Sequence, residues 1–211
     1  MFTGLTESCA RVLSLLPPDQ SPAGMHLLTL EIPAFTAATG DSISINGCCL
    51  TVSRHSHPIM EFDISAETLS CTCLKELRPG SLVNVERALQ LSSRLGGHLV
   101  SGHIDEAGQV LISEAQPEGY LLELMVSPAA APLLIPKGSI AINGVSLTIN
   151  RVQDTDQGVR ISMMLIPETL RMTNLGRQKP GDLVNVEFDQ TGKFIWRQQQ
   201  LLRSSQPPLP S

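Results

Sequence analysis

The sequence repeats itself. The ten residues SISINGCCLT (42–51) return as SIAINGVSLT (139–148), 97 positions later, with seven of the ten unchanged. A second stretch, PGSLVNVE (79–86), returns as PGDLVNVE (180–187) after 101 positions. The repeated stretches occur in the same order in both halves, and their period is too long for a solenoid. The chain is therefore predicted to contain two copies of one domain, joined in tandem.

The 211 residues are enough for two domains of ordinary size. A change of composition in LQLSSRLGG marks the end of the first copy. The predicted boundaries are a first domain over residues 1–97, with its linker at about 88–97, a second domain over 98–189, a helix over 190–204 and a flexible tail over 205–211.

Each half shows the alternation of a β-strand. Ile43 and Ile45 alternate with Ser42 and Ser44, and Asn46-Gly47 then offers two residues that tolerate positive φ in a tight hairpin turn. Many short strands within roughly 90 residues, punctuated by Pro-Gly pairs, favour a small closed antiparallel barrel. An all-β fold with this barrel built twice is therefore predicted.

The phase of the hairpins predicts which polar residues face outward. If the flanking apolar residues face the cores, Cys49 and Thr51 point outward in the first half, and Ser146 and Thr148 do so in the second. Each pair lies beside a glycine turn, where a flat ligand can approach the backbone closely. An ordinary solvated sheet face would look the same for one hairpin, but its repetition favours a pair of binding surfaces.

The two halves differ at two positions where only the second half has an ionisable side chain. Leu5 in the first half corresponds to His103 in the second, and Gly40 corresponds to Lys137. An imidazole changes charge near neutral pH and serves as an acid or a base. The sequence thus predicts a base and a cation on the side of the second barrel.

Composition excludes several classes of function. The formal charge is −5 and there is no run of Lys or Arg, so a nucleic-acid partner is not expected. No apolar stretch reaches membrane-spanning length and no signal pattern is present, which predicts a cytoplasmic protein that does not enter a membrane. Five cysteines without a Cys-x-x-Cys pair indicate free thiols and no metal site.

The end of the chain changes character. From Gly192 onward it reads KFIWRQQQLLRSS, where Phe194 and Ile195 recur seven residues later as Leu201 and Leu202. This spacing predicts one apolar stripe along a short helix. The stripe could pack on its own barrel or against other subunits, and the sequence leaves both open.

Five motifs together resemble the riboflavin synthase family: MFTG, NGCCLTV, GGHLVSGHID, NGVSLT and LIPETL. The resemblance runs from Met1 to about Arg197. It implies two tandem Greek-key antiparallel β-barrels with pseudo-twofold symmetry plus a C-terminal α-helix, and a homotrimer clasped by these helices. It also implies a dismutation of two 6,7-dimethyl-8-ribityllumazine molecules that yields riboflavin and 5-amino-6-(D-ribitylamino)uracil. No cofactor and no metal are implied, and an association with lumazine synthase is left open.

The resemblance also implies site residues, at an active site between the first barrel of one subunit and the second barrel of its neighbour. The implied catalytic residues are Ser42, Cys49, His103 and Thr148. Whether Cys49 is a nucleophile or only lines the pocket stays open. The implied substrate-binding residues are Gly4, Leu5, Thr6, Cys49, Leu50, Thr51, Asp63, Ile64, Ser65, Ala66, Glu67, Thr68, Gly102, His103, Ile104, Lys137, Ser146, Leu147, Thr148, Met164, Leu165, Ile166, Pro167, Glu168 and Thr169.

Two other functions compete with the enzyme. A lumazine- or flavin-binding protein of the same fold would bind the ligand without reaction, but relatives of that kind lose the histidine and the small nucleophile that His103, Cys49 and Ser42 supply here. A double-barrel module for protein partners would not need the mismatched pairs between the halves. The enzyme is the favoured interpretation.

Overall fold

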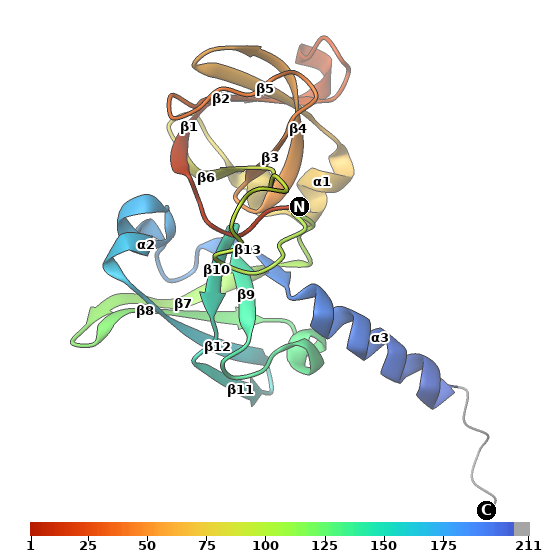
Figure 1. Cartoon of the computed structure of the whole chain (residues 1–211), viewed down its shortest axis with the longest axis vertical. Helices are drawn as coiled ribbons and strands as arrows, with labels where there is room; N and C mark the ends of the chain where they lie inside the picture. The colour runs from red at the N-terminus through yellow and green to blue at the C-terminus, as the bar shows by residue number, and fades with distance from the viewer. Residues whose placement is uncertain (205–211) are drawn as a thin grey trace, which may run out of the picture.

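The computed structural model describes residues 1–204, so the predicted flexible tail lies outside the described residues. Two β-structured lobes are stacked, and a long helix leaves the second lobe (Figure 1). The first lobe contains β1 (Ser8–Leu16), η1 (Pro18–Gln20), β2 (His26–Glu31), β3 (Ser42–Ile45), β4 (Cys48–Ser56), β5 (Ile59–Ile64), α1 (Ala66–Cys71), η2 (Cys73–Glu76) and β6 (Leu82–Arg87). The second contains β7 (Glu106–Gln116), β8 (Gly119–Val126), η3 (Pro128–Leu133), β9 (Ser139–Ile142), β10 (Val145–Thr148), β11 (Arg151–Thr155), β12 (Gly158–Leu165), α2 (Pro167–Met172), η4 (Leu175–Arg177) and β13 (Leu183–Phe188), and α3 (Gln190–Ser204) follows it.

The first lobe is a closed six-stranded antiparallel barrel in the order β1-β2-β5-β4-β3-β6. The predicted hairpin is confirmed, because β3 pairs with β4 and the turn between them has positive φ at both Asn46 and Gly47. Leu50 and Val52 point into the core of the barrel, while Cys49 is half-buried and Thr51 is exposed on the outer face. Strand alternation in the sequence thus predicted the inside and the outside of this barrel correctly.

The second lobe is a seven-stranded sheet in the order β10-β9-β13-β7-β8-β12-β11. The fold class is confirmed, but the prediction of a second fully closed barrel needs correction. The two ends of this sheet, β10 and β11, correspond to the single strand β4 of the first barrel and are separated only by Ile149 and Asn150. At that break the amide of Ile149 bonds to Gly138 on one side and that of Asn150 to Ser162 on the other, so the sheet curls round without one continuous closing strand.

Strands β6 and β13 are buried on both faces. Val83 and Val85 point into the first core, as their alternation predicts, but Asn84 and Glu86 are only 2% and 6% exposed. The reason is that the outer faces of these strands meet the other lobe and the N-terminal turns, which local periodicity does not reveal. Buried polar groups require hydrogen-bond partners. Asn84 finds one across the contact between the lobes, and Glu86 finds its partners in the N-terminal turn at Thr3 and Gly4.

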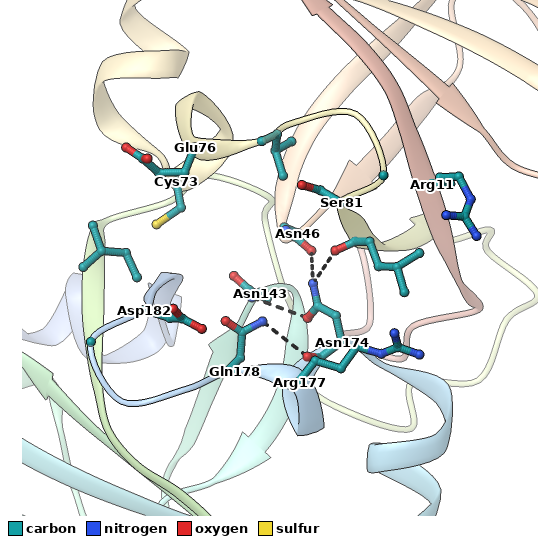
Figure 2. A pocket seen from close by; sticks show the side chains of 15 residues that line it. Arg11, Asn46, Cys73, Glu76, Ser81, Asn143, Asn174, Arg177, Gln178 and Asp182 are labelled. Atoms are coloured by element: carbon teal, nitrogen blue, oxygen red, sulfur yellow. Dashed lines mark hydrogen bonds between the residues drawn. The ribbon is translucent and has the colours of Figure 1, made fainter.

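A reciprocal network of asparagines joins the two lobes. Asn84 donates from Nδ2 to the carbonyl of Asn143 at 2.9 Å, and its counterpart Asn185 donates to the carbonyl of Asn46 at 2.8 Å. Both donors also receive main-chain N–H groups on their Oδ1 atoms, from Asn174 and from its counterpart Cys73, each at 2.7 Å. These paired bonds show the pseudo-twofold relation of the lobes. Figure 2 shows Asn46, Asn143 and Asn174 close together at this junction.

The predicted C-terminal helix is present as α3, which extends away from the second lobe (Figure 1). Its start is tied to the body by the ion pair between Lys193 and Asp105, with Nζ 2.7 Å from Oδ2. Among the helices of residues 1–204, none combines the length and the apolar character needed to cross a bilayer.

Candidate functional site

The segments that precede the two barrels cross each other. Phe2 and Val100 form an antiparallel bridge, with the amide of each donating to the carbonyl of the other at 2.7 and 3.1 Å. Both side chains are fully buried, together with Ala141 and beside Cys49. Beyond this crossing, each segment lies on the barrel of the other half.

The segment of the second half lies on the first barrel. The amide of Cys49 donates to the carbonyl of Gly102 at 2.8 Å. Gly102 has φ +84°, and a Cβ at this position would come within 2.6 Å of the Cβ of Cys49. Glycine is therefore required for the approach. His103 follows directly, so the prediction that the base lies on the side of the second barrel is wrong: it accompanies Cys49 of the first barrel.

The segment of the first half lies on the second barrel in the same way. The amide of Ser146 donates to the carbonyl of Gly4 at 2.8 Å, and a Cβ on Gly4 would come within 2.6 Å of the Cβ of Ser146. Leu5 follows, with its side chain half exposed. The correspondence of Leu5 with His103 is therefore real in three dimensions, but each residue stands on the opposite barrel from the one to which its sequence position assigned it.

Two outer surfaces result. The first surface consists of Ser42, Cys49, Thr51, Asp63 and His103. Ser42 is paired directly with Thr51 on the neighbouring strand, and cross-strand partners point to the same face, so Ser42, Cys49 and Thr51 share it. The Oδ1 atom of Asp63 is buried and has no hydrogen-bond partner within the described chain.

The second surface consists of Leu5, Lys137, Ser139, Ser146 and Thr148. Lys137 has φ +67°, the left-handed conformation that its counterpart Gly40 adopts at +95°. Their amides make equivalent bonds, to Ile149 at 2.7 Å and to Val52 at 2.9 Å. A non-glycine residue in this conformation costs about 1–2 kcal/mol. The fold therefore holds Lys137 in a backbone conformation that a lysine disfavours. Lys137 lies on the second barrel with its side chain exposed, and its role as a cation of the site stays a prediction.

The two adjacent cysteines have different environments. Cys48 points into the first core, and burial raises the pKa of its thiol to about 12. That group stays protonated at neutral pH and cannot act as a nucleophile. Cys49 lies on the outer face beside the Gly102 turn, so it is the thiol that a ligand can reach.

The other predicted binding residues differ in how accessible their side chains are. The side chains of Leu50, Ile64 and Leu165 are in the barrel cores, so these residues can offer a ligand only backbone groups. The stretches around the starts of α1 and α2 are more accessible: Ser65 caps α1 by accepting the amide of Thr68 at 3.0 Å, and Glu168 is exposed and paired with Arg171. The remaining members are Thr6, Ala66, Glu67, Ile104, Leu147, Met164, Ile166, Pro167 and Thr169, of which Ile166 is a large exposed apolar residue.

Sequence reasoning gave no role to His98, which the structure places against the second surface. Its Nδ1 lies 2.7 Å from the Oγ of Ser146. Gly97 permits this contact, because a Cβ there would come within 2.1 Å of the carbonyl of Thr3 and 2.8 Å of the Cβ of Ser146. The glycine pair before His98 in GGHLVSGHID was the available signal. Burial lowers the pKa of His98, so its imidazole is neutral at neutral pH and orients the serine hydroxyl.

The lowered pKa of His98 predicts a loss of stability in acid. The unfolded chain protonates this residue near pH 6.5 and the folded chain only below that. Stability is therefore lost as pH falls from about 6.5 through the folded pKa, with a slope no steeper than about 1.4 kcal/mol per unit for this one proton. Urea unfolding at about pH 7.5 and about pH 5.5 checks this, because the free energy of unfolding of the wild type should fall more than that of His98→Asn. Parallel losses in both proteins would contradict it.

A cavity of about 790 Å³ between the lobes contains none of the predicted site residues. Figure 2 shows its lining, with Asn46, Asn143 and Asn174 at the junction and Glu76, Asp182, Arg11 and Arg177 around them. Acidic and basic groups are balanced there, and the floor is the asparagine network already described. We therefore regard this cavity as part of the contact between the lobes and not as a part of the two outer surfaces.

Comparison with known proteins also divides the chain into two related domains. The domain family described as "Lumazine binding domain" matches residues 3–88 and 101–189. The chain is 38% identical to a riboflavin synthase of Mycobacterium tuberculosis (strain ATCC 25618 / H37Rv) over 209 residues, which cover 97% of this chain and 100% of that protein. It is also 38% identical to a riboflavin synthase of Escherichia coli (strain K12) over 195 residues, which cover 90% and 87% of the two.

Solved structures show the same fold. LumP complexed with 6,7-dimethyl-8-(1'-D-ribityl) lumazine is 25% identical and superposes with a TM-score of 0.71 over 89% of this chain and 98% of that one. LumP complexed with flavin mononucleotide is also 25% identical and superposes with a TM-score of 0.73 over 90% of this chain and all of the other.

Proposed function

The chain belongs to the riboflavin synthase family, and from this premise we propose that it converts two molecules of 6,7-dimethyl-8-ribityllumazine into riboflavin and 5-amino-6-(D-ribitylamino)uracil. The observation that carries the proposal is the pair of related but unequal surfaces. One ring can rest on each surface, and only the first surface has both an imidazole residue and an accessible thiol. Two identical surfaces would bind both rings without giving them different roles.

The reaction needs no oxidant or reductant. One lumazine gives a four-carbon unit to the other, and the two products together contain all the atoms of the two substrates. The enzyme therefore acts as a transferase whose tasks are to bind, to orient and to move protons. A proton must leave a methyl carbon of one lumazine, and protons must return to the nitrogens of the ring that loses its carbons. Side chains with a pKa near neutrality perform such transfers.

The residues of each surface divide these tasks. We assign to His103 the removal and return of protons, and to Cys49 and Ser42 the contacts with the ring bound on the first barrel. On the second barrel, Thr148 and the Ser146 hydroxyl, held by His98, contact the other ring, and the ammonium of Lys137 is available to oppose negative charge on a deprotonated lumazine. Buried Cys48 takes no part.

The two rings must meet face to face, and we propose that two chains bring them together. The outer faces of the two barrels are open, with Thr51, His103 and Thr148 all exposed. We propose that the first surface of one subunit faces the second surface of its neighbour in a homotrimer held by α3, whose large apolar residues are also exposed. A cytoplasmic location and an association with lumazine synthase stay predictions from the sequence.

The reaction itself is the decisive test. The purified protein mixed with 6,7-dimethyl-8-ribityllumazine should form riboflavin, detected by its absorbance, together with an equal amount of the diaminouracil product. LumP structures hold riboflavin, the lumazine or flavin mononucleotide, so a binding protein of the same fold is the second candidate. Binding of the lumazine without riboflavin formation would support that candidate and exclude the enzyme.

The repeated surfaces predict two ligands per chain. Because Thr51 and Thr148 stand at matching positions beside the turns at Gly47 and Gly144, each barrel should bind one ring. Titration calorimetry with a non-reactive lumazine analogue should give two binding events, of unequal affinity because the side chains differ. A stoichiometry of one, without a weaker second phase, would contradict the pair of surfaces.

A further inference from the structure

Buried Glu187 on β13 holds the turn that carries His103. Its side chain is 1% exposed. One carboxylate oxygen accepts the amide and the hydroxyl of Ser101 at 2.6 and 2.7 Å, and the other accepts the amide of Gly102 at 2.9 Å. Bonds to an ionised carboxylate are shorter and stronger than neutral ones, so three of them fix this turn firmly.

The hydrogen bonds continue from this turn to both reactive residues. The Ser101 hydroxyl donates to Glu187 and, at 3.3 Å, accepts a hydrogen bond from the amide of His103. The carbonyl of Gly102 accepts the amide of Cys49 at 2.8 Å. One carboxylate thus sets where the backbone of His103 stands relative to that of Cys49, across a contact between the two halves of the chain.

We propose that Glu187 is a positioning residue for the chemical step, through which the second half of the chain places His103 on the first barrel next to Cys49. This inference rests on the proposed function of His103 as the proton-transfer group. It goes beyond that function because Glu187 lies in the body of the second sheet and acts only through Ser101 and Gly102.

The duplication supplies a matched control in Glu86 on β6. This carboxylate is 6% exposed and accepts the amide and hydroxyl of Thr3 at 2.7 and 2.6 Å and the amide of Gly4 at 3.1 Å. The next hydrogen bond also recurs, because the Thr3 hydroxyl accepts the amide of Leu5 at 3.3 Å, as the Ser101 hydroxyl accepts that of His103. Each glutamate thus accepts the same three hydrogen bonds from its turn, but the turn held by Glu86 ends in a leucine that cannot transfer a proton.

The test compares Glu187→Gln with Glu86→Gln in the full-length protein. Glutamine keeps the shape of the side chain but replaces one acceptor oxygen by a donor, which then opposes a turn amide. We expect Glu187→Gln to lower kcat about 10–100-fold with a smaller change in KM, since small displacements of a catalytic group cost rates of this order. Glu86→Gln should instead raise KM and lower kcat by less than about 3-fold, because it disturbs a binding surface without a proton-transfer group.

Thermal unfolding of both variants is the control for a merely structural role. Loss of the carboxylate should lower the unfolding midpoints of Glu187→Gln and Glu86→Gln by similar amounts. An unchanged kcat in Glu187→Gln, or equal losses of kcat in the two variants, would overturn the proposal. If Glu187→Gln does not fold, Ser101→Ala and Thr3→Val decide by the same comparison, because they leave both glutamates in place and remove the hydroxyls that accept the amides of His103 and Leu5. Ser101→Ala also removes the 3.2 Å hydrogen bond from Nε2 of Gln190. Absence of riboflavin formation by the wild type would refute the proposed function instead, so the two failures are distinguishable.

Discussion

Replacing His103 with glutamine is expected to lower the rate of riboflavin formation about 10²–10⁴-fold, the usual contribution of a positioned acid–base group. Glutamine preserves the approximate size of the side chain and some hydrogen bonding but does not titrate near neutral pH. Binding of the lumazine should weaken much less, because Gly102 still fixes the turn on Cys49 and Thr51 keeps its place on the first surface. Absorbance assays of riboflavin and ligand titration of the same variant separate the two effects.

The same substitution at His55 is the matched control. His55 is exposed on β4 and has no part in either surface, so His55→Gln should retain the wild-type rate. An unchanged rate in His103→Gln would remove this residue from the mechanism. Equal losses of rate and affinity would make it a binding residue instead of the proton-transfer group.

The parts of the structure that follow from local patterns were predictable from the sequence. Alternation of residue types placed Leu50 inside and Thr51 outside, and Asn46-Gly47 predicted the turn, because side-chain direction in a strand depends only on its neighbours. The repeat extended each assignment to the second half. The pairing of Gly40 with Lys137 also held, although it required a lysine in a conformation that glycine adopts more easily.

The crossing of the two segments was not predictable in this way. Which barrel receives His103 depends on the bridge between Phe2 and Val100 and on the bond from Cys49 to Gly102, and these contacts join residues far apart in the sequence. A spacing of 98 positions shows that Leu5 and His103 correspond, but not which surface each one faces. The sequence thus identified the residue and misplaced it.

Burial of polar groups was missed for the same reason. Asn84 and Glu86 alternate with valines as if they faced water, yet the second lobe and the N-terminal turn cover them. His98 was passed over because a single histidine has no periodicity, and only its 2.7 Å contact with Ser146 reveals what it does. Apart from the glycine pair before His98, the residues that connect the two copies show no local pattern that distinguishes them from exposed polar residues.

Loss of the exposed apolar face of α3 is expected to convert the proposed trimer into monomers of low activity. Phe194 is 70% exposed, Ile195 55% and Leu202 64%, and they lie on one side of the helix. Contiguous apolar surface of this kind is normally buried between chains. A chain ending at Lys193 removes the face but keeps the lysine that pairs with Asp105. Light scattering should report a single-chain mass for it.

The activity of these monomers should fall on the order of 100-fold or more, because a site shared between subunits can no longer hold its two rings in contact. The triple variant Phe194→Gln, Ile195→Gln, Leu202→Gln separates the apolar face from the helix itself, since glutamine favours helix nearly as well as leucine. Leu91→Gln, at a fully exposed leucine of the linker, is the control and should stay trimeric. A truncated protein that remained trimeric would show that other contacts hold the subunits together. Monomers with wild-type turnover would place both rings within one chain and contradict the shared site.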